Sequence, residues 1–474
     1  MIFNSEVFIL FAAIFFAVYF VLPYRPQLLL TLAASYVFYA WWDWRFCALI
    51  AASTAFNFAA GTVIGRHSLS RAGRWLLGTA VAVNLAVLGF FKYFHFFADG
   101  FVALLNDLGL QASESTLRII LPIGISFYTF HSLSYVIDIY RGRIRPEPDP
   151  AVFATYIALW PQLVAGPIVR ASRLIPQLKT RKSFSFPRLL VGCELVIVGF
   201  FLKCVVADRL APITDSVFAA PSAFNGLNVL IGAIFFGFQI YGDFCGYSLI
   251  AIGLARIMGL NLGRNFRRPY FASSFSEFWQ RWHISLSGWL RDYLYVPLGG
   301  NRGSKLATFR NLFATMLLGG LWHGAAWTFV LWGGLHGLYL VLQRLLAPVH
   351  DLVSARGALA RRGIVGLEMA GVLTAVFAAW VFFRAGSSEA AWLVFAQMVS
   401  GGYDFAAVQN KFQVVMGMGL IGLLVAAEAT AEQPALRNGF RRARAARVTM
   451  AISLLCLLAL FGNFTGSQFI YFQF

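Results

Sequence analysis

Charged residues are scarce in this chain: of 474 residues only 12% are Asp, Glu, Lys or Arg, about half the share of a typical soluble domain. Hydrophobic residues make up 59% of the chain, and the mean hydropathy is +0.70. This composition excludes an ordinary soluble globular protein. Apolar runs of about 20 residues, long enough to cross a bilayer as a helix, recur along the chain and predict an all-α polytopic membrane protein. These runs begin at Val7, Leu28, Phe46, Leu76, Leu189, Val229, Ile364, Val415 and Met450.

Acidic residues are few as well: 20 Asp and Glu stand against 38 Lys and Arg, and the net charge is +18. The basic residues lie in short loops between apolar runs and form no long charged tract, so nucleic acid is not the expected partner. Lysine and arginine instead mark the cytoplasmic loops of membrane proteins. We therefore place loops 208–215 and 387–404, which are poor in positive charge, outside, together with both termini. The loops expected in the cytoplasm are 66–74, 141–148, 170–188, 263–270 and 437–447.

Cysteine is rare, and several motifs of well-known enzyme classes are missing. The five cysteines are scattered, form no CxxC pair and lie mostly in apolar runs, which is typical of buried small side chains rather than disulfides or metal ligands. No phosphate-binding GxxxxGK[ST] loop, GxSxG nucleophile elbow or HExxH zinc motif occurs. We expect neither a metal nor a bound cofactor. The first apolar run follows Glu6 rather than a basic segment, so we interpret it as a retained span.

Two segments have basic residues on both flanks and should return to the side from which they enter. The first, "AVFATYIALWPQLVAGPIV" (151–169), contains Pro161, Gly166 and Pro167, which break a straight helix and predict a re-entrant element. The second covers residues 311–347, which must also go in and come back. We count about eleven spans plus re-entrant segments, within a single membrane domain of residues 1–474.

Residues 265–303 stand between two spans and carry aromatic and basic side chains in a helical pattern. An aromatic face with a basic remainder predicts an amphipathic helix in the membrane interface, on the cytoplasmic side. In one interpretation the helix is a membrane-surface anchor, and its arginines serve only to keep this segment on the cytoplasmic side. Alternatively, the basic residues surround a cytoplasmic mouth that binds a phosphate-rich acyl donor. These residues are Arg267, Arg268, Arg281, Arg291, Arg302 and Lys305. The aromatic face, at spacings of three and four, comprises Trp279, Trp282, Leu286, Trp289 and Tyr293.

Two histidines stand in the apolar stretch "MLLGGLWHGAAWTFVLWGGLHG" (316–337), each followed by glycine. On an unbroken helix, His323 and His336 would be about 20 Å apart and rotated by roughly 220°. They can share one small site only if the glycines break the helix or the chain turns back. An intramembrane histidine is either a packing residue or a site facing a cavity, and the cost of burying it favours the site. Asp243 and Gln239, also in an apolar run, are either cavity lining or a satisfied interhelical pair.

The combination of motifs resembles the membrane-bound O-acyltransferase family, and within it the branch of alginate O-acetylases and teichoic acid D-alanyl transfer proteins. The resemblance runs through the whole chain in order. Its strongest parts are "FWQRWHISLSGWLRDYLYVPLGGNRG" and "LLGGLWHGAAWTFVLWGGLHG". Further parts are "LPIGISFYTFHSLSYVIDIYRG" (121–142), "WPQLVAGPIVR" (160–170), "YGDFCGYSLIAIGLARIMG" (241–259), "NFRRPY" and the ending "FIYFQF".

The resemblance implies helices around a central tunnel, with His323 of "LWHG" as the catalytic residue. A histidine can act as a base near neutral pH, as acetyl transfer from a thioester to a hydroxyl requires. His336 is then secondary. The residues expected to support the site or line the tunnel are His336, Trp322, His131, Asp243 and Gln239, and those expected at the donor-binding mouth are Arg281, His283 and Arg291.

The implied function is transfer of an acetyl group from a cytoplasmic donor, acetyl-CoA, for O-acetylation of an exopolysaccharide such as alginate. The protein would lie in the bacterial inner membrane, among lipids, and would act through extracytoplasmic acetyltransferase partners. Two alternatives stay open. One is D-alanyl transfer to teichoic acid, and the other is a non-enzymatic export or transport subunit that uses the broken helices as a substrate path.

Overall fold

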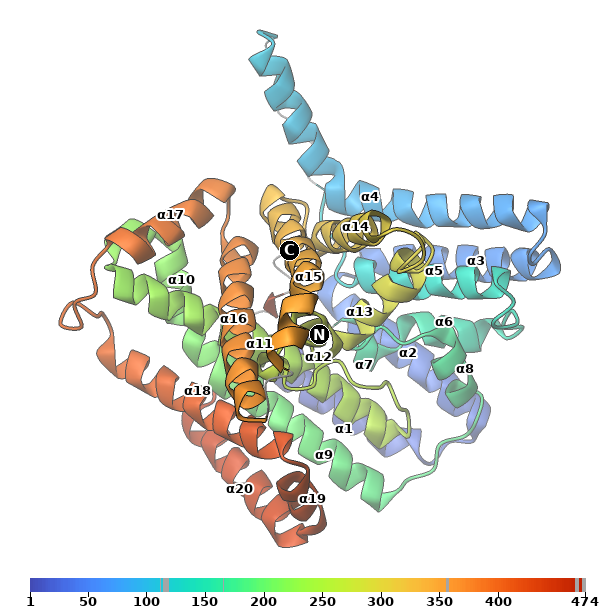
Figure 1. The fold of residues 1–474 in the computed structure, drawn as a ribbon. Helices are drawn as coiled ribbons and strands as arrows, with labels where there is room; N and C mark the ends of the chain where they lie inside the picture. Colours follow the sequence, from blue (N-terminus) through green and yellow to red (C-terminus); the bar gives the residue numbers. More distant parts are fainter. Residues whose placement is uncertain (111, 114–118, 165, 355–357, 465–468, 471–474) are drawn as a thin grey trace. The chain divides into compact units, whose positions relative to one another are not determined.

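The computed structural model describes residues 1–110, 112–113, 119–164, 166–354, 358–464 and 469–470, and all regular structure in these residues is helical (Figure 1). Eight of the described helical segments are long and apolar enough to cross a membrane, which confirms the predicted all-α class with many spans. The chain forms two compact units. The first contains Met1–Val196 and Leu249–Gly263, and the second contains Ile197–Ser248 and Arg264–Phe474. The assignment of residues 1–474 to a single domain stays a prediction.

The first unit is built from the amino-terminal helices, of which α2 packs on α6 and α3 packs on both α4 and α5. Figure 1 shows α4 bent, with its carboxyl-terminal part, in cyan, projecting away from the rest of this unit. The helices are α1 (Glu6–Tyr19), α2 (Tyr24–Asp43), α3 (Arg45–Arg66), α4 (Arg71–Asp107), α5 (Ile125–Tyr140), α6 (Pro150–Ala158), α7 (Trp160–Leu163), α8 (Ala171–Leu178), most of α9 (Phe186–Phe200) and the end of α11 (Gly226–Met258).

The predicted break in residues 151–169 is confirmed. Helix α6 begins at Pro150, where the Asp149 carboxylate accepts the Ala151 N–H at 2.9 Å. It ends at Ala158, because Leu159 has a non-helical backbone with φ −52° and ψ 111° before the single turn of α7. Most side chains of α6 and all four of α7 are buried, which suits an irregular backbone that must be enclosed by protein. The side from which the segment enters stays a prediction.

The second unit contains the remaining helices, including four short elements of 3₁₀ or π geometry. It holds the end of α9, η1 (Phe201–Ala207), α10 (Asp208–Ala219), η2 (Pro221–Ala223), most of α11, η3 (Pro269–Phe271), α12 (Phe275–Arg281), α13 (Ile284–Leu290), η4 (Arg291–Tyr295), α14 (Lys305–His323), α15 (Trp327–Ser354), α16 (Ala358–Arg384), α17 (Ser388–Ser400), α18 (Lys411–Glu432), α19 (Pro434–Arg442) and α20 (Arg444–Phe461).

Helices α14 and α15 form a hairpin, as predicted for residues 311–347, and pack on each other. Glycines make the approach possible. A Cβ atom on Gly320 would lie 2.3 Å from the Phe329 carbonyl oxygen, and one on Gly333 would lie 2.5 Å from the Met316 carbonyl oxygen. Both distances are shorter than a non-bonded contact, so the two helix backbones can meet only where these side chains are missing. Close helix contact through small residues is typical of membrane proteins.

The predicted amphipathic helix is wrong in one respect, because two helices stand where one was expected. Helix α12 ends at Arg281, and Trp282 and His283 adopt extended and left-handed conformations before α13 begins. The side chains of the expected aromatic face are buried against other parts of the protein, and Trp282, for example, lies against Trp380 and Phe266. The exposed fraction of Trp279, Trp282, Leu286, Trp289 and Tyr293 is 8% or less.

Candidate active site

His323 is the last residue of α14 and lies in an aromatic enclosure within the second unit. Its exposed fraction is 4%. Its ring centroid is 4.9 Å from that of Trp322, 5.0 Å from that of Trp332 and 5.5 Å from that of Phe383. The helix ends here because Gly324 takes an extended conformation. The imidazole therefore sits at the turn of the hairpin, where α14 gives way to α15.

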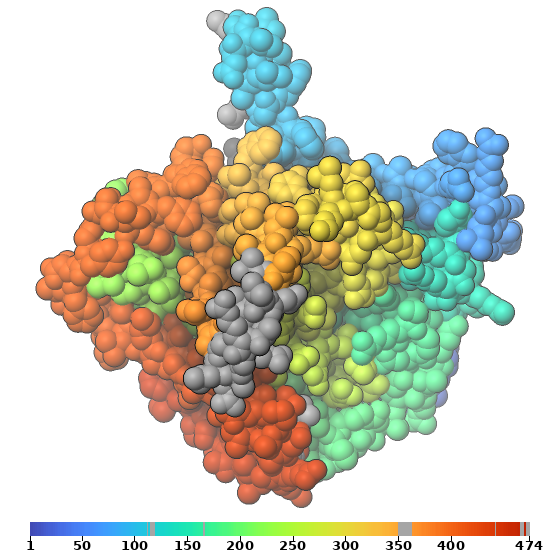
Figure 2. All heavy atoms as spheres, in the orientation of Figure 1, coloured from blue at the N-terminus to red at the C-terminus, as the bar shows by residue number. Residues whose placement is uncertain are grey.

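His336 lies against the same tryptophan as His323. Its ring centroid is 4.8 Å from that of Trp332 and 5.0 Å from that of Trp279. Neither ring nitrogen has a hydrogen-bond partner among the described residues, and the exposed fraction is 0%. The chain turn thus brings the two histidines onto one indole ring, which an unbroken helix could not do. In the space-filling view, the hairpin forms part of the visible face, in yellow to orange, while both histidines are buried (Figure 2).

His283 also lies beside His323, and their ring centroids are 6.3 Å apart. It occupies the kink between α12 and α13 with a left-handed backbone, φ 42°. The Phe244 ring meets it edge-on at 4.6 Å, and its exposed fraction is 0%. Burial lowers the pKa of His283 to about 3, so the ring is neutral at physiological pH. The structure places it in the aromatic enclosure, not at an exposed mouth.

Asp243 takes part in a buried ion cluster. Lys203 in η1 lies 2.6 Å from Asp243 and 2.8 Å from Asp208, and all three side chains are at most 4% exposed. The other Asp243 oxygen accepts the backbone N–H of Ile470 at 2.7 Å. Of the two open interpretations for Asp243, the structure favours the satisfied interhelical pair. Gln239, one turn earlier on α11, does not join this cluster, and its side-chain oxygen has no hydrogen-bond partner among the described residues.

The two arginines of the predicted donor-binding mouth differ in their surroundings. The Arg281 side chain is 11% exposed, lies 2.6 Å from Glu277 and also pairs with Glu432. The Arg291 side chain is 67% exposed and pairs with the adjacent Asp292 at 2.7 Å. Carboxylates thus already occupy the guanidinium group of Arg281. A role of either arginine in donor binding stays a prediction.

His131 belongs to the first unit and has a clear structural contact there. Its Nε2 atom accepts the backbone N–H of Val169 at 3.2 Å, and its ring lies 5.6 Å from Tyr156. The hydrogen bond holds the end of the broken segment 151–169 against α5. This favours the packing role over the polar lining that we also considered.

Sequence reasoning missed several residues of the site. Part of the aromatic enclosure is formed by Trp332, Trp380 and Phe383. The ring of Trp332 stacks on that of Trp380 with centroids 5.6 Å apart, and its centroid is 5.3 Å from that of Phe383. No local pattern distinguishes them from other aromatic residues in apolar helices. Lys203 was also missed, although a lysine within an apolar run, five residues before Asp208, is a signal for a functional or paired group.

The enclosure can support proton transfer at a reacting group. An imidazole accepts a proton near neutral pH, and aromatic walls exclude water that would compete for an activated acyl group. A hydroxyl acceptor activated by the histidine fits this arrangement.

Comparison with known proteins agrees with this chemistry. A family model described as "MBOAT, membrane-bound O-acyltransferase family" matches residues 143–373, which include His283, His323 and His336. The "Probable alginate O-acetylase AlgI" of Azotobacter vinelandii is 44% identical over 417 residues, covering 87% of this chain and 81% of the relative. The "Peptidoglycan O-acetyltransferase" of Helicobacter pylori is 34% identical and covers 84% of this chain and 80% of its own length.

More distant relatives act on another acyl group. The "Teichoic acid D-alanyltransferase" of Streptococcus thermophilus is 29% identical over 47% of this chain and 56% of its own length. The relatives that match most of the chain are therefore named as O-acetylases, and the site contains a buried histidine at the motif position. On this evidence the chain is a multi-pass membrane O-acyltransferase and belongs to the membrane-bound O-acyltransferase family.

Proposed function

We propose that this enzyme takes an acetyl group from acetyl-CoA on the cytoplasmic side of the bacterial inner membrane for O-acetylation of an exopolysaccharide, with alginate as the first candidate. The observation that carries the proposal is His323, buried among Trp322, Trp332 and Phe383 at the end of α14. The names of the relatives that cover most of the chain support acetyl as the acyl group and a polysaccharide as the acceptor.

In the proposed mechanism His323 is the general base. Its imidazole removes the proton of an acceptor hydroxyl, and the hydroxyl oxygen attacks the thioester carbonyl. The carbon–sulfur bond then breaks, the acetyl group remains on oxygen as an ester, and the leaving thiolate takes the proton from the imidazolium. His336 and His283 shape the enclosure, since both are fully buried among aromatic rings. Extracytoplasmic acetyltransferase partners would complete delivery to the polymer.

Substitution of His323 tests the catalytic role. We expect His323→Ala to abolish acetylation of the polymer while expression and membrane insertion stay near wild type, because alanine is inserted without a polar group. His336→Ala, the matched control in the same hairpin, should retain measurable activity. Equal and complete loss in both variants would mean that the two histidines act as one unit. Normal acetylation in His323→Ala would reduce this residue to packing.

Donor and acceptor can be separated from the alternatives by isotope transfer. Membranes that contain the enzyme and its neighbouring gene products are supplied with acetyl-labelled acetyl-CoA, or with D-alanine loaded on a carrier protein. The proposal expects label in a polysaccharide fraction only from acetyl-CoA. Label from D-alanine would support the teichoic acid function instead. A transport subunit would move polymer with no label incorporated, and its flux would tolerate His323→Gln.

A further inference from the structure

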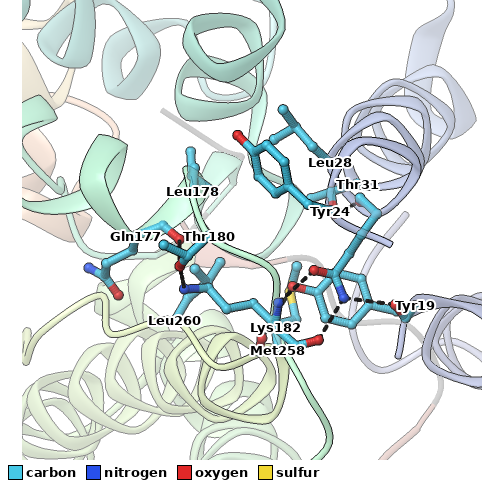
Figure 3. Close-up of a pocket in the computed structure, with 11 residues that line it drawn as sticks. Tyr19, Tyr24, Leu28, Thr31, Gln177, Leu178, Thr180, Lys182, Met258 and Leu260 are labelled. Carbon is cyan, nitrogen blue, oxygen red and sulfur yellow. Dashed lines mark hydrogen bonds between the residues drawn. The ribbon is translucent and has the colours of Figure 1, made fainter. Parts of the chain in front are cut away.

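The first unit contains a small hollow, lined from α1, α2, α8, the following loop and the end of α11 (Figure 3). It is a shallow hollow that is open to solvent. Leu28, Met258 and Leu260 form apolar parts of its wall, while Tyr24, Thr180 and Lys182 present polar groups. None of these residues takes part in the site around His323.

Lys182 is the cation of this hollow. Figure 3 shows its amino group directed to the hydroxyl of Thr180, at 2.8 Å. A lysine ammonium has three donors, so this bond leaves donor capacity for a ligand. The backbone of Lys182 is fixed, because Gln27 bonds both its N–H at 2.7 Å and its carbonyl at 2.8 Å. The loop thus holds the lysine at the hollow through two long-range hydrogen bonds.

A second cation converges on the same place. A Cβ atom on Gly259 would lie 2.7 Å from Nη1 of Arg188 and 3.4 Å from Cδ of Lys182. Gly259 has φ +87°, a backbone conformation that glycine adopts without strain. Both side chains therefore pass over a glycine backbone that leaves them room. The other amino group of Arg188 donates to the Ser183 carbonyl at 2.6 Å.

The charges of these two side chains are not balanced by nearby carboxylates among the described residues. Glu147 and Asp149, which face Tyr24, already pair with Lys179 and Arg25 respectively. Among the described residues, the side chain of Lys182 donates to a hydroxyl and that of Arg188 to a carbonyl, and both acceptors are neutral. Burial, and then the positive charge of Arg188, lower the pKa of Lys182. The negative charge of a bound anion would stabilise the charged form of Lys182 against both burial and the repulsion from Arg188.

We propose that this hollow binds a phosphate ester, held by Lys182 and Arg188. Arginine and lysine together are the usual phosphate ligands, and a basic pocket at the end of membrane helices suits a phosphorylated headgroup. The apolar wall accommodates the carbon atoms next to the ester. Two molecules supply this chemistry: an anionic phospholipid, and a soluble phosphorylated donor. Only the second source rests on the proposed acetyl transfer.

Binding to the purified full-length protein tests the proposal. Delipidated protein in detergent is titrated with phosphatidylglycerol, with diacylglycerol of the same chains, and with coenzyme A, and bound molecules are counted by native mass spectrometry. The test variants are Lys182→Gln and Arg188→Gln, alone and combined. Arg181→Gln is the matched control, because Arg181 lies in the same loop, donates to the Leu22 carbonyl and does not line the hollow. Arg188→Lys keeps the charge if Arg188→Gln fails to fold.

We expect each cation removed to weaken phosphatidylglycerol binding about fivefold, which corresponds to the usual contribution of a basic residue near anionic headgroups. Diacylglycerol binding and the Arg181→Gln variant should be unchanged. Loss of coenzyme A binding with unchanged phosphatidylglycerol binding would identify the soluble donor as the source. If no probe binds less tightly to Lys182→Gln than to Arg181→Gln, the hollow is not a phosphate site. None of these measurements needs acetylation, so they stand or fall separately from the role of His323.

Discussion

Lys203 lies between Asp208 at 2.8 Å and Asp243 at 2.6 Å, with its side chain 2% exposed. Such a buried cluster is sensitive to the loss of one charge, because the remaining charges lose their compensation. We expect Lys203→Met to lower the free energy of unfolding by about 3–5 kcal/mol. The measurement is the thermal unfolding midpoint of the purified protein in detergent.

Two further variants test this explanation of Lys203. Lys203→Arg keeps the charge and should unfold close to the wild-type midpoint. Combining Lys203→Met with Asp208→Asn and Asp243→Asn removes every charge of the cluster, and should recover much of the loss. If Lys203→Met alone unfolds like the wild type, the two carboxylates are compensated in another way and the cluster does not hold η1 against α11.

His283 makes stability depend on pH in a defined direction. Its pKa falls to about 3 in the folded protein because it is buried, while the unfolded chain keeps a value of about 6.5. Between about pH 6.5 and pH 3 the unfolded state binds more protons, so the stability is fully present above that range and is lost as pH falls through it. At about pH 5 this residue should account for a loss of about 2 kcal/mol.

The pH effect can be measured with His283→Asn, since asparagine tolerates the left-handed backbone at this position. We expect its unfolding midpoint to fall less than that of the wild type between pH 7.5 and about pH 5. His95→Asn serves as the control, because His95 is a half-buried residue of the first unit that accepts the Ile119 N–H through Nε2. Parallel pH profiles for His283→Asn and the wild type would contradict the prediction.

The sequence alone could identify residues whose burial in an apolar run costs free energy. It could not predict which side chains would surround them. His323, His336 and Asp243 were predicted because a polar group in an apolar run is expensive unless it has a role or a partner. The partners came from distant parts of the chain: Lys203 for Asp243, and Phe383 for His323. A local window contains no information about which of many aromatic residues will face a given histidine.

At the scale of elements, the α14–α15 hairpin depends on glycine at the helix contact. A Cβ atom on Gly333 would lie 2.5 Å from the Met316 carbonyl, whereas one on the adjacent Gly334 would come no nearer than 3.7 Å to Leu317. We therefore expect Gly333→Ala to force the helices apart and to move Trp332, and with it the contacts of both histidines. We expect the rate of acetylation to fall at least about tenfold in Gly333→Ala, which corresponds to an increase of about 1.4 kcal/mol in the activation free energy.

Gly334→Ala is the matched control for this experiment. It adds the same methyl group one position along the same helix, into ordinary van der Waals space. Its acetylation activity and unfolding midpoint should stay near those of the wild type. Equal losses in the two variants would show that helix propensity or expression, rather than the close contact, governs the effect.

The elements also show why a period of three and four was misleading in residues 279–293. The pattern predicted one helix with these five side chains on one face, and all five are buried. It did not reveal the kink, where Trp282 is extended and His283 is left-handed, because neither residue carries a local signal for such a backbone. The break in residues 151–169, by contrast, is marked by proline, which has a local signature.

At the scale of the whole molecule, the sidedness of the loops follows from the bias of lysine and arginine and can be measured directly. With the five native cysteines replaced, we expect single cysteines at Ser183 and Gly439 to react only from the cytoplasm. A cysteine at Ser388 should react from the outside. The reagent is a membrane-impermeant maleimide, applied to intact cells and to inverted vesicles.

The re-entrant assignment of residues 151–169 adds a further expectation. Cysteines at Pro148 and Ser183 flank this segment and should label from the same side, because a re-entrant segment returns to the face from which it enters. Labelling from opposite sides would mean that the segment crosses the membrane. The orientation of both termini, predicted outside, would then have to be reassigned from this point of the chain.

Composition and patterning by themselves determined that this protein is an all-helical membrane protein, where most spans lie, and that two histidines stand in an apolar stretch that goes in and comes back. They could do so because the bilayer imposes length and apolarity on every span locally. Only the tertiary structure decided that His323 and His336 share Trp332, that Arg281 pairs with Glu432, and that Lys203 is buried beside Asp243. The two ion pairs join residues far apart in sequence, and the shared ring requires the chain to turn between α14 and α15. These contacts depend on how closely packed helices meet, which no local pattern encodes.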